Sequence, residues 1–296
     1  MTVVVGSNFY RGDASVTRRQ QAAVAAVTAL KGVDPINLQW TDEAGAATER
    51  EMETLAVLRH DSKTVTGLPL RRKPIMPEIF DALAAAASAR GCRYFAFYNA
   101  DVLVTQAAID AIADGGRQSY AFSRMDFDGE TGQDSGLMPN GIDMFAFDVA
   151  WWRAERRRFR DYILGEWFYD PVFASLMMRY GDGLILNRHG EIRHEIHGHR
   201  PPSGAAAEYN GYLAALDSPF FSMWAGYRAR LDELRARGAG EGEERALQRE
   251  AFARPITVGA AAYHAGRCAR AFVRYRMTNR GPCNAVTLGA ATAESR

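Results

Sequence analysis

An amide and a carboxylate interrupt one of the most apolar stretches of the sequence. Residues 94–105 read YFAFYNADVLVT, so Asn99 and Asp101 stand one residue apart where the apolar run stops before it resumes. A carboxylate in this place can ligate a hard divalent cation, whose preferred ligands are oxygen atoms. The same two residue types are also common in turns and at helix starts, where they cap backbone N–H groups. The segment by itself therefore allows a metal site or a structural turn.

Histidines gather late in the sequence, in the stretch 191–199 that reads EIRHEIHGH. If this stretch is a strand, side-chain alternation puts His197 and His199 on one face and His194 on the other. We therefore expect that His197 and His199 can share a metal ion or a phosphate with Asp101. The simpler alternative is one functional histidine and two surface histidines. A zinc hydrolase is not indicated, because the Glu-Ile-His spacing is one residue short of the zincin helix motif.

Two further carboxylates lie in surroundings that call for a role. Asp170 follows three aromatic residues and precedes Pro171 where a helix is predicted to begin. It can therefore act as a general base, as a helix cap, or as both. Asp143 lies inside the apolar stretch 141–149. Burying that carboxylate alone would cost on the order of several kcal/mol, so it must be paired or functional.

The elements that must position these residues alternate in type through the first hundred residues. Short β-branched or apolar runs at 2–8, 36–42, 54–61 and 94–105 alternate with helical patterns at 15–31 and 74–90. This order predicts an α/β fold with a mostly parallel central sheet flanked by helices. Ligands bind beyond the carboxyl ends of strands in such sheets. Polar residues follow several of these predicted strand ends, namely Ser7, Asn8, Asp42, His60, Asp61, Asn99 and Asp101.

The second half of the chain is organised differently. Strands are predicted at 119–127, 141–149 and 191–199, with a loop at 128–140 and a helix at 170–181. An amphipathic helical region at 209–237 leads into a predicted loop, ARGAGEGEER, and then a basic stretch from Arg254. We find no repeat and no linker that divides the chain. The prediction is one domain over 1–296, with a core at about 1–202 and a helical C-terminal extension at about 203–296.

Composition excludes several classes of function. Thirty-six Lys and Arg against 35 Asp and Glu give a net charge of +1, so no overall field is present to hold a nucleic acid, although a local patch remains possible. Three widely spaced cysteines match no disulfide or zinc framework and suit a reducing compartment. No apolar run approaches the roughly 18 residues of a membrane span. The prediction is a cytoplasmic chain without a transmembrane segment.

Four segments, in order along the chain, resemble the landmarks of glycosyltransferases of the GT-A fold. They are FYNADVLV (97–104), NGIDMFAF (140–147), GEWFYDPVFASLM (165–177) and HEIHGHRP (194–201). The similarity covers about residues 1–202, and a narrower similarity is to majastridin-like bacterial glycosyltransferases. It implies a Rossmann-like, metal-dependent enzyme that moves a sugar from a UDP- or GDP-linked donor to a saccharide, lipid or protein acceptor.

The resemblance also implies roles for the candidate residues. Asp101, with His197 or His199, would hold Mn²⁺ or Mg²⁺ across the donor diphosphate. Asn99 stands where many relatives have an aspartate, so it would contact a water or the ribose. Residues on the nucleotide-sugar side would be Ser7, Asn8, Asp42, Arg72 and Lys73.

The remaining implied roles concern the reaction itself. Asp170 would be the general base of an inverting enzyme, and Asp143 would bind a hydroxyl of the donor sugar. Aromatic side chains near these residues would stack against a sugar or pack in the core, namely Trp151, Trp152, Trp167, Phe168 and Tyr169.

Two other functions remain open. A sugar-nucleotidyltransferase would share the sheet, but its glycine-rich triphosphate loop with Arg and Lys is poorly matched by VVVGSNFYRGDAS (3–15). A non-catalytic nucleotide-binding protein of the same fold is the second alternative. Arg72 and Lys73 have a plainer alternative too, as part of a solvated charged loop.

Overall fold

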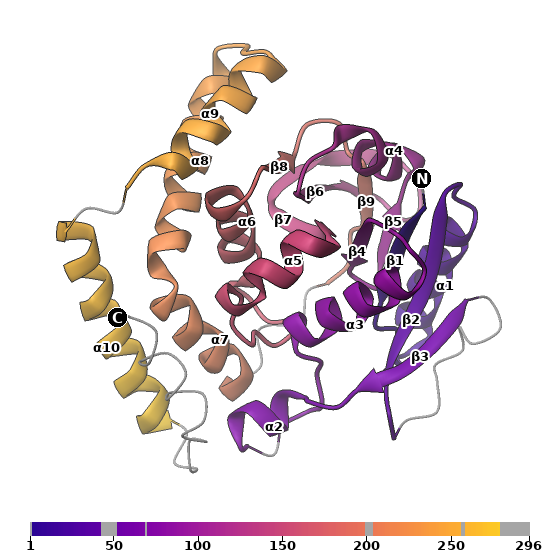
Figure 1. The fold of residues 1–296 in the computed structure, drawn as a ribbon, viewed down its shortest axis with the longest axis horizontal. Helices are drawn as coiled ribbons and strands as arrows, with labels where there is room; N and C mark the ends of the chain where they lie inside the picture. The colour runs from indigo at the N-terminus through magenta and orange to yellow at the C-terminus, as the bar shows by residue number, and fades with distance from the viewer. Residues whose placement is uncertain (1, 43–51, 69, 199–203, 256–257, 279–296) are drawn as a thin grey trace.

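The computed structural model describes residues 2–42, 52–68, 70–198, 204–255 and 258–278 (Figure 1). Its strands are β1 Val3–Ser7, β2 Val33–Trp40, β3 Glu53–Leu58, β4 Tyr94–Tyr98, β5 Val102–Val104, β6 Ser119–Phe127, β7 Asp134–Asp148, β8 Gly183–Leu186 and β9 Ile192–Glu195. Its α-helices are α1 Ala14–Thr28, α2 Ser62–Thr66, α3 Met76–Ala89, α4 Gln106–Gly115, α5 Val149–Glu155, α6 Tyr169–Tyr180, α7 Gly204–Leu216, α8 Ser218–Ala236, α9 Glu241–Ala253 and α10 Val258–Thr278. A short 3₁₀ helix, η1, spans Arg156–Arg158.

The strands of the described chain form one mixed sheet in the order β3-β2-β1-β4-β7-β6-β9-β5, with β8 paired to β6. The first four of these strands, β3, β2, β1 and β4, are parallel to one another. Strand β7 is antiparallel to both β4 and β6. A connection of only a few residues joins β6 to β7, and such a short connection permits only an antiparallel pair. The predicted α/β class is confirmed, with parallel order in the N-terminal half and mixed order beyond it.

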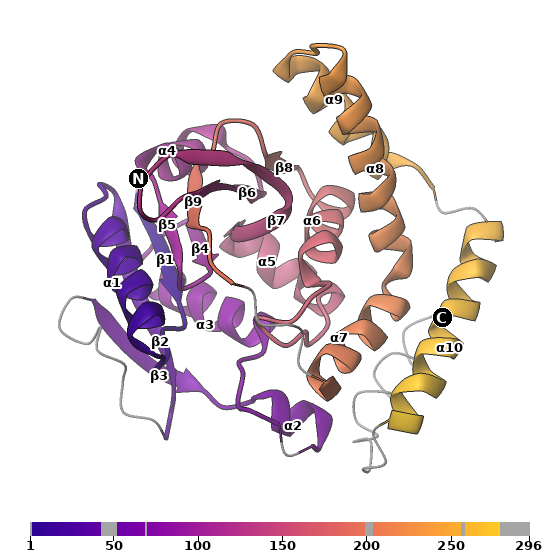
Figure 2. The same ribbon diagram turned by 180° about the vertical axis from the view of Figure 1, so that it is seen from behind.

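Helices cover both faces of the sheet, as the alternation along β4 requires. Phe95 and Phe97 pack in the apolar cluster under α3, α5 and α6. Tyr94, Ala96 and Tyr98 point the other way, into the cluster built with α1 and α4. Both views show these helices on opposite sides of the strands (Figures 1 and 2). A strand buried on both faces must be apolar at every position, which explains the continuous run that precedes Asn99.

Element boundaries differ from the sequence prediction at several places, among them β7, β9 and α9. β7 begins at Asp134, inside the predicted loop at 128–140, because it pairs with the whole second half of β6. β9 ends at Glu195, before the last histidines. Helix α9 begins at Glu241, inside the predicted ARGAGEGEER loop. Three glutamates in its first turn favour the helix N-terminus, and Gly240 N–H donates to Glu243 Oε2 at 3.0 Å.

The C-terminal helices continue the apolar core on the α6 side of the sheet. Side chains of α7, α8 and α9 belong to the same cluster as α3 and α6, among them Leu213, Trp224, Tyr227, Leu247 and Phe252. Helix α10 packs mainly on α7 and lies at the outer margin in both views (Figures 1 and 2). The helical C-terminal part is therefore confirmed. Among the described residues, no helix is both long and apolar enough to cross a membrane.

Candidate functional site

The site lies where the carboxyl ends of the parallel strands meet β9. Strand β9 sits between β5 and β6, and its register sets His194 opposite Val102 on one side and Asp126 on the other. Val102 directly follows Asp101 in the chain. Backbone pairing alone therefore brings His194 close to both Asp101 and Asp126.

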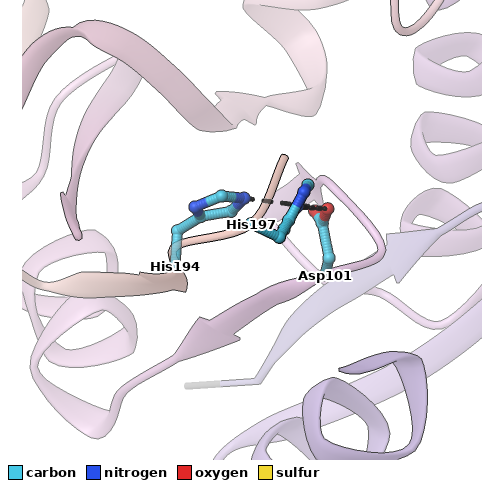
Figure 3. Close-up of side chains that lie close together, drawn as sticks. All are labelled: Asp101, His194 and His197. Carbon is cyan, nitrogen blue, oxygen red and sulfur yellow. Dashed lines mark hydrogen bonds and ion pairs between the residues drawn. The ribbon is translucent and has the colours of Figure 1, made fainter. Parts of the chain in front are cut away.

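Asp101, His194 and His197 converge on one point (Figure 3). Asp101 Oδ2 lies 3.1 Å from His197 Nε2 and 3.7 Å from His194 Nε2. One oxygen and two nitrogen atoms of this trio lie within 4.8 Å of one another. His194 is buried, while Asp101 and His197 retain part of their exposure. The trio is therefore partly open to solvent at Asp101 and His197.

The prediction about which histidines share a face is wrong for His194. We expected it on the face opposite His197, on the assumption that the strand continues to residue 199. Because β9 ends at Glu195, alternation no longer governs His197, whose ring turns back to within 4.9 Å of the His194 ring centroid. His199 lies outside the described residues.

The charges of the trio favour an ionised Asp101 and a protonated His197. Burial alone would raise the pKa of Asp101, but the hydrogen bonds and charges of His194 and His197 outweigh it and hold that pKa below its usual range. The hydrogen bond with Asp101 raises the pKa of His197, against the opposing effect of burial. Asp101 is thereby kept as an anion, the form that a cation requires.

A chain of charged groups joins the trio to Asp143. His194 Nδ1 lies 3.3 Å from Asp126 Oδ1. Arg124 donates from Nε to Asp126 at 2.8 Å and from Nη1 to Asp143 at 2.9 Å. Asp143 also accepts from Asn99 Nδ2 at 2.7 Å. Asp143 is therefore paired, as its burial demanded.

Asp170 has the opposite environment to Asp101. It lies in the first turn of α6, and its Oδ1 atom is buried with no hydrogen-bond partner in the described part of the chain. Burial, followed by the nearby charge of Asp143, raises the pKa of Asp170 well above its ordinary value, although Arg124 opposes this. Tyr169 is buried beside it and interacts with Asn99. The predicted helix start at Asp170 is correct, but its carboxyl is not a satisfied cap.

The backbone before Asp170 is held in an unusual conformation. Phe168 has φ of 90°, the one positive value among described residues other than glycine. Such a conformation costs about 1–3 kcal/mol and persists only where surrounding contacts impose it. Asn210 of α7 supplies these contacts, since its side chain bonds the backbone of Ile163 and the carbonyl of Trp167. Trp167 itself projects outward and is 64% exposed.

The other aromatic candidates divide clearly. Trp151 and Trp152 are buried in the core, where Trp152 Nε1 donates to Asp81 at 2.9 Å. Tyr169 is also buried, and Phe168 packs against the core from its edge. Trp167 is therefore the candidate among them whose ring is mostly exposed.

Predicted residues of the nucleotide-sugar side lie at the ends of β1 and β2. Ser7 is buried and its Oγ has no partner among the described residues. Asn8 is buried and donates to the Leu38 carbonyl at 2.7 Å. Asn37 and Gln39 of β2 hold the backbone of the next residue, Phe9. This polar lining at a strand end is where an α/β sheet binds ligands.

The basic residues before α3 are engaged in ion pairs. Arg72 contacts Asp42 at 2.8 Å and Asp61 at 3.0 Å, and its guanidinium lies 4.3 Å from the Trp40 ring centroid. Lys73 forms an ion pair with Glu166, which is buried. Arg72 and Asp42 therefore form a second cluster, while Lys73 ties this region to the segment that precedes Asp170.

Three residues of the site were missed by sequence reasoning: His194, Arg124 and Asp126. His194 was assigned to the wrong face. Arg124 and Asp126 are polar residues at the end of an otherwise apolar strand, SYAFSRMDF, which is the signal that drew attention to Asn99 and Asp101. Applying that signal to β6 as well would have found them.

Comparisons with known proteins find similarity only at the level of structure. No protein-family model matches the chain, and no curated protein matches it by sequence. The structure of S. aureus TarS residues 1–349 in complex with UDP-GlcNAc aligns with a TM-score of 0.48 and 10% identity, over 95% of this chain and 92% of that one. A protein from Desulfovibrio desulfuricans G20, named as a nucleotide-diphospho-sugar transferase, aligns with a TM-score of 0.31 and 10% identity, over 51% of this chain and 65% of that one.

Proposed function

We propose that the chain is a metal-dependent glycosyltransferase that moves a sugar from a nucleotide-diphosphate donor to an acceptor hydroxyl. The observation that carries this proposal is that one site contains two carboxylates with opposite surroundings. Asp101 sits with two imidazoles and is kept ionised, while burial and the nearby charge of Asp143 raise the pKa of Asp170. Divergent pKa values of this kind are typical of catalytic sites, in which the groups have different tasks.

The trio of Asp101, His194 and His197 fits a divalent cation. It offers one carboxylate oxygen and two imidazole nitrogens within mutual reach. Two imidazoles suit Mn²⁺ better than Mg²⁺, which prefers oxygen ligands throughout. When bound, such an ion would stabilise the negative charge that gathers on a diphosphate leaving group. We assign His197 and add His194 as ligands, while His199 lies outside the described residues.

Asp126 supports this assignment by its position behind His194. A carboxylate next to Nδ1 favours the tautomer with hydrogen on Nδ1, which leaves Nε2 free to ligate. That Nε2 atom is the one that faces Asp101. We therefore assign Asp126 the task of orienting His194.

On the donor side, we assign the nucleotide-sugar to the edge lined by Ser7, Asn8 and Asn99. Asn99 lies between the metal ligand Asp101 and the carboxylate of Asp143, with which it is hydrogen-bonded. A contact of Asp143 with a donor-sugar hydroxyl remains our prediction. Arg72 and Lys73 would contact the donor only by exchanging their present partners, Asp42 and Glu166.

On the acceptor side, we assign Asp170 as the general base. It would accept the proton of the acceptor hydroxyl as the bond between the sugar and the diphosphate breaks. A carboxylate with a raised pKa is a stronger base than an ordinary one. Asn210 holds the Trp167 carbonyl, and the exposed ring of Trp167 would stack on a saccharide acceptor beside Asp170.

Two histidines and one carboxylate also suit a zinc hydrolase, so a metal-dependent hydrolase is the second candidate. Thermal unfolding with UDP and GDP, each tested with Mn²⁺, Mg²⁺, Zn²⁺ or a chelator, separates the two. A transferase should be stabilised by one diphosphate together with Mn²⁺, by about 2.7 kcal/mol at a hundredfold excess over Kd. Stabilisation by Zn²⁺ alone, with no response to either diphosphate, would refute the transferase proposal.

The reaction assay distinguishes the remaining alternatives. A glycosyltransferase slowly hydrolyses its own donor and releases the nucleoside diphosphate. A sugar-nucleotidyltransferase would release pyrophosphate instead, and a binding protein would release neither product.

A further inference from the structure

Helix α10 carries a concentration of positive charge that the site does not use. Its sequence, VGAAAYHAGRCARAFVRYRMT, contains four arginines and no acidic residue. The whole chain has a net charge of only +1, so the rest of it is net negative. The helix lies at the outer margin of the molecule and packs on α7 and, less extensively, on α8 (Figures 1 and 2).

The uncovered side of α10 is divided into two parallel strips. At about 100° per residue, one strip is basic and carries one aromatic ring. It consists of Tyr263, Arg267, Arg270 and Arg274. The strip beside it is apolar and exposed from Val258 to Val273, and consists of Val258, Ala262, Ala265, Ala269 and Val273. The next position of this strip in the sequence is Arg276. The opposite side faces the protein, where His264 is buried and Cys268 contacts the Ala215 carbonyl of α7 at 2.5 Å.

The exposure of these strips is high. Val258 is 89% exposed, Tyr263 60% and Val273 54%. Arg270 and Arg274 are exposed as well, and Arg267 is half-buried. An exposed apolar strip of this kind indicates an interaction site, and the arginines beside it indicate that the binding partner is negatively charged.

We propose that α10 docks the protein on the surface of a lipid bilayer that contains anionic lipids. Arginines of the basic strip contact the headgroup phosphates, while Val258, Val273 and the alanines between them lie against the acyl boundary. A helix lying in the interface with basic and apolar sides is a recognised form of reversible membrane attachment. The negative surface potential of such a membrane attracts the arginines of the basic strip and strengthens the attachment.

The apolar strip favours a membrane over a nucleic acid. Phosphates of a nucleic acid would engage the arginines alone, and the neighbouring valines would stay in water. A bilayer engages both strips in one orientation, because the apolar strip enters the acyl boundary while the arginines beside it reach the headgroup phosphates.

The test is co-sedimentation of the full chain with vesicles of phosphatidylcholine alone, or of phosphatidylcholine with phosphatidylglycerol. We expect binding to the anionic vesicles only, and release at about 1 M salt, where the Debye length falls to roughly 3 Å. The double variant Arg270→Glu with Arg274→Glu should bind at least on the order of a hundredfold more weakly, because each lost arginine contact costs about a factor of five and reversal adds repulsion.

A matched control reverses two exposed arginines on other elements. Arg59→Glu with Arg153→Glu makes the same change in net charge outside α10 and should leave vesicle binding as in the parent. Equal loss in both double variants would overturn the proposal, because binding would then follow net charge and not the helix. So would binding to a DNA duplex, but not to anionic vesicles, with the same dependence on Arg270 and Arg274.

A third variant tests the apolar strip without any change of charge. Val258→Ser with Val273→Ser should weaken binding to anionic vesicles by roughly tenfold or more, since two apolar side chains no longer leave water. Both positions are exposed, so folding should survive, and the unfolding temperature of each variant checks this. Unchanged vesicle binding would overturn the seating of α10 in the interface.

Discussion

Asp101 and Asp170 lie in one site but are surrounded in opposite ways. Asp101 faces two imidazoles, which hold its pKa low. Among the described residues, one oxygen of Asp170 is buried without a hydrogen-bond partner, and burial together with the nearby charge of Asp143 raises its pKa. One carboxylate therefore suits the proposed place beside a cation, and the other suits the proposed gain and loss of a proton. Neither task can be inferred from residue type, because both residues are aspartates at the ends of apolar segments.

The largest expected effect comes from removing the base. Asp170→Asn keeps the shape of the side chain but cannot accept a proton, so transfer should fall by about 10²–10⁴-fold. Donor and metal affinity should stay close to those of the parent, because Asp170 is not one of the proposed ligands. Turnover, with donor hydrolysis as the first assay, and calorimetry of Mn²⁺ with the nucleotide measure both quantities.

A matched control for this change is Asp13→Asn. Asp13 caps α1 by accepting from the Val16 amide, so it makes the same substitution at a helix start that is not part of the site. Near-parental turnover in Asp170→Asn, with a loss of stability like that of Asp13→Asn, would reduce Asp170 to a cap. A retaining enzyme would instead lose turnover on changing Asp143.

The second effect is on metal affinity. Asp101→Asn removes the one anionic group of the trio, so Mn²⁺ affinity should fall by at least about a hundredfold, which corresponds to a few kcal/mol. Calorimetric titration of Mn²⁺ measures this directly. Asp134→Asn is the control. Asp134 forms an ion pair with Arg193, which lies on β9 next to His194, but Asp134 is not part of the trio. Parental affinity in Asp101→Asn would remove the metal from this place.

Elements that depend on local sequence periodicity could be predicted, whereas contacts that depend on strand order could not. The apolar runs and helical spacing predicted β1, α1, α3, β4 and α6 to within a few residues, because those elements are set by local periodicity. The sequence also singled out Asp101, His197 and Asp170. It failed for His194, since its place depends on where β9 ends and on which strands flank it. Strand order and the burial of a single oxygen atom are properties of the folded chain, which periodicity does not encode.

A smaller effect should follow from Asp126, which contacts the trio only through His194. Asp126→Asn should lower Mn²⁺ affinity by about 10–100-fold, because the tautomer and orientation of His194 are no longer fixed. The proton NMR resonance of the His194 Nδ1–H should shift or broaden in the same variant, a change that general destabilisation would not produce selectively. An unchanged affinity would show that Asp126 serves only to pair with Arg124.

The smallest expected effect is on stability, and its sign differs between the two carboxylates. For metal-free protein, a carboxyl with a raised pKa contributes stability that is complete below the unfolded pKa of about 3.9 and is lost as pH rises through the folded value. Asp170→Asn removes that loss, so its unfolding temperature should match the parent near pH 4 and exceed it increasingly at higher pH.

For Asp101, with a lowered pKa, the contribution is present above about pH 4 and disappears as pH falls. Asp101→Asn should therefore unfold below the parent at neutral pH, and the gap should close in acid. Each kcal/mol corresponds to roughly 2–4 °C in a chain of this size. Thermal scans between about pH 4 and 9 resolve the Asp170 trend, and scans below about pH 4 show whether the Asp101 gap closes. If both variants moved in the same direction, the two aspartates would share one environment, and the division of tasks between them would be lost.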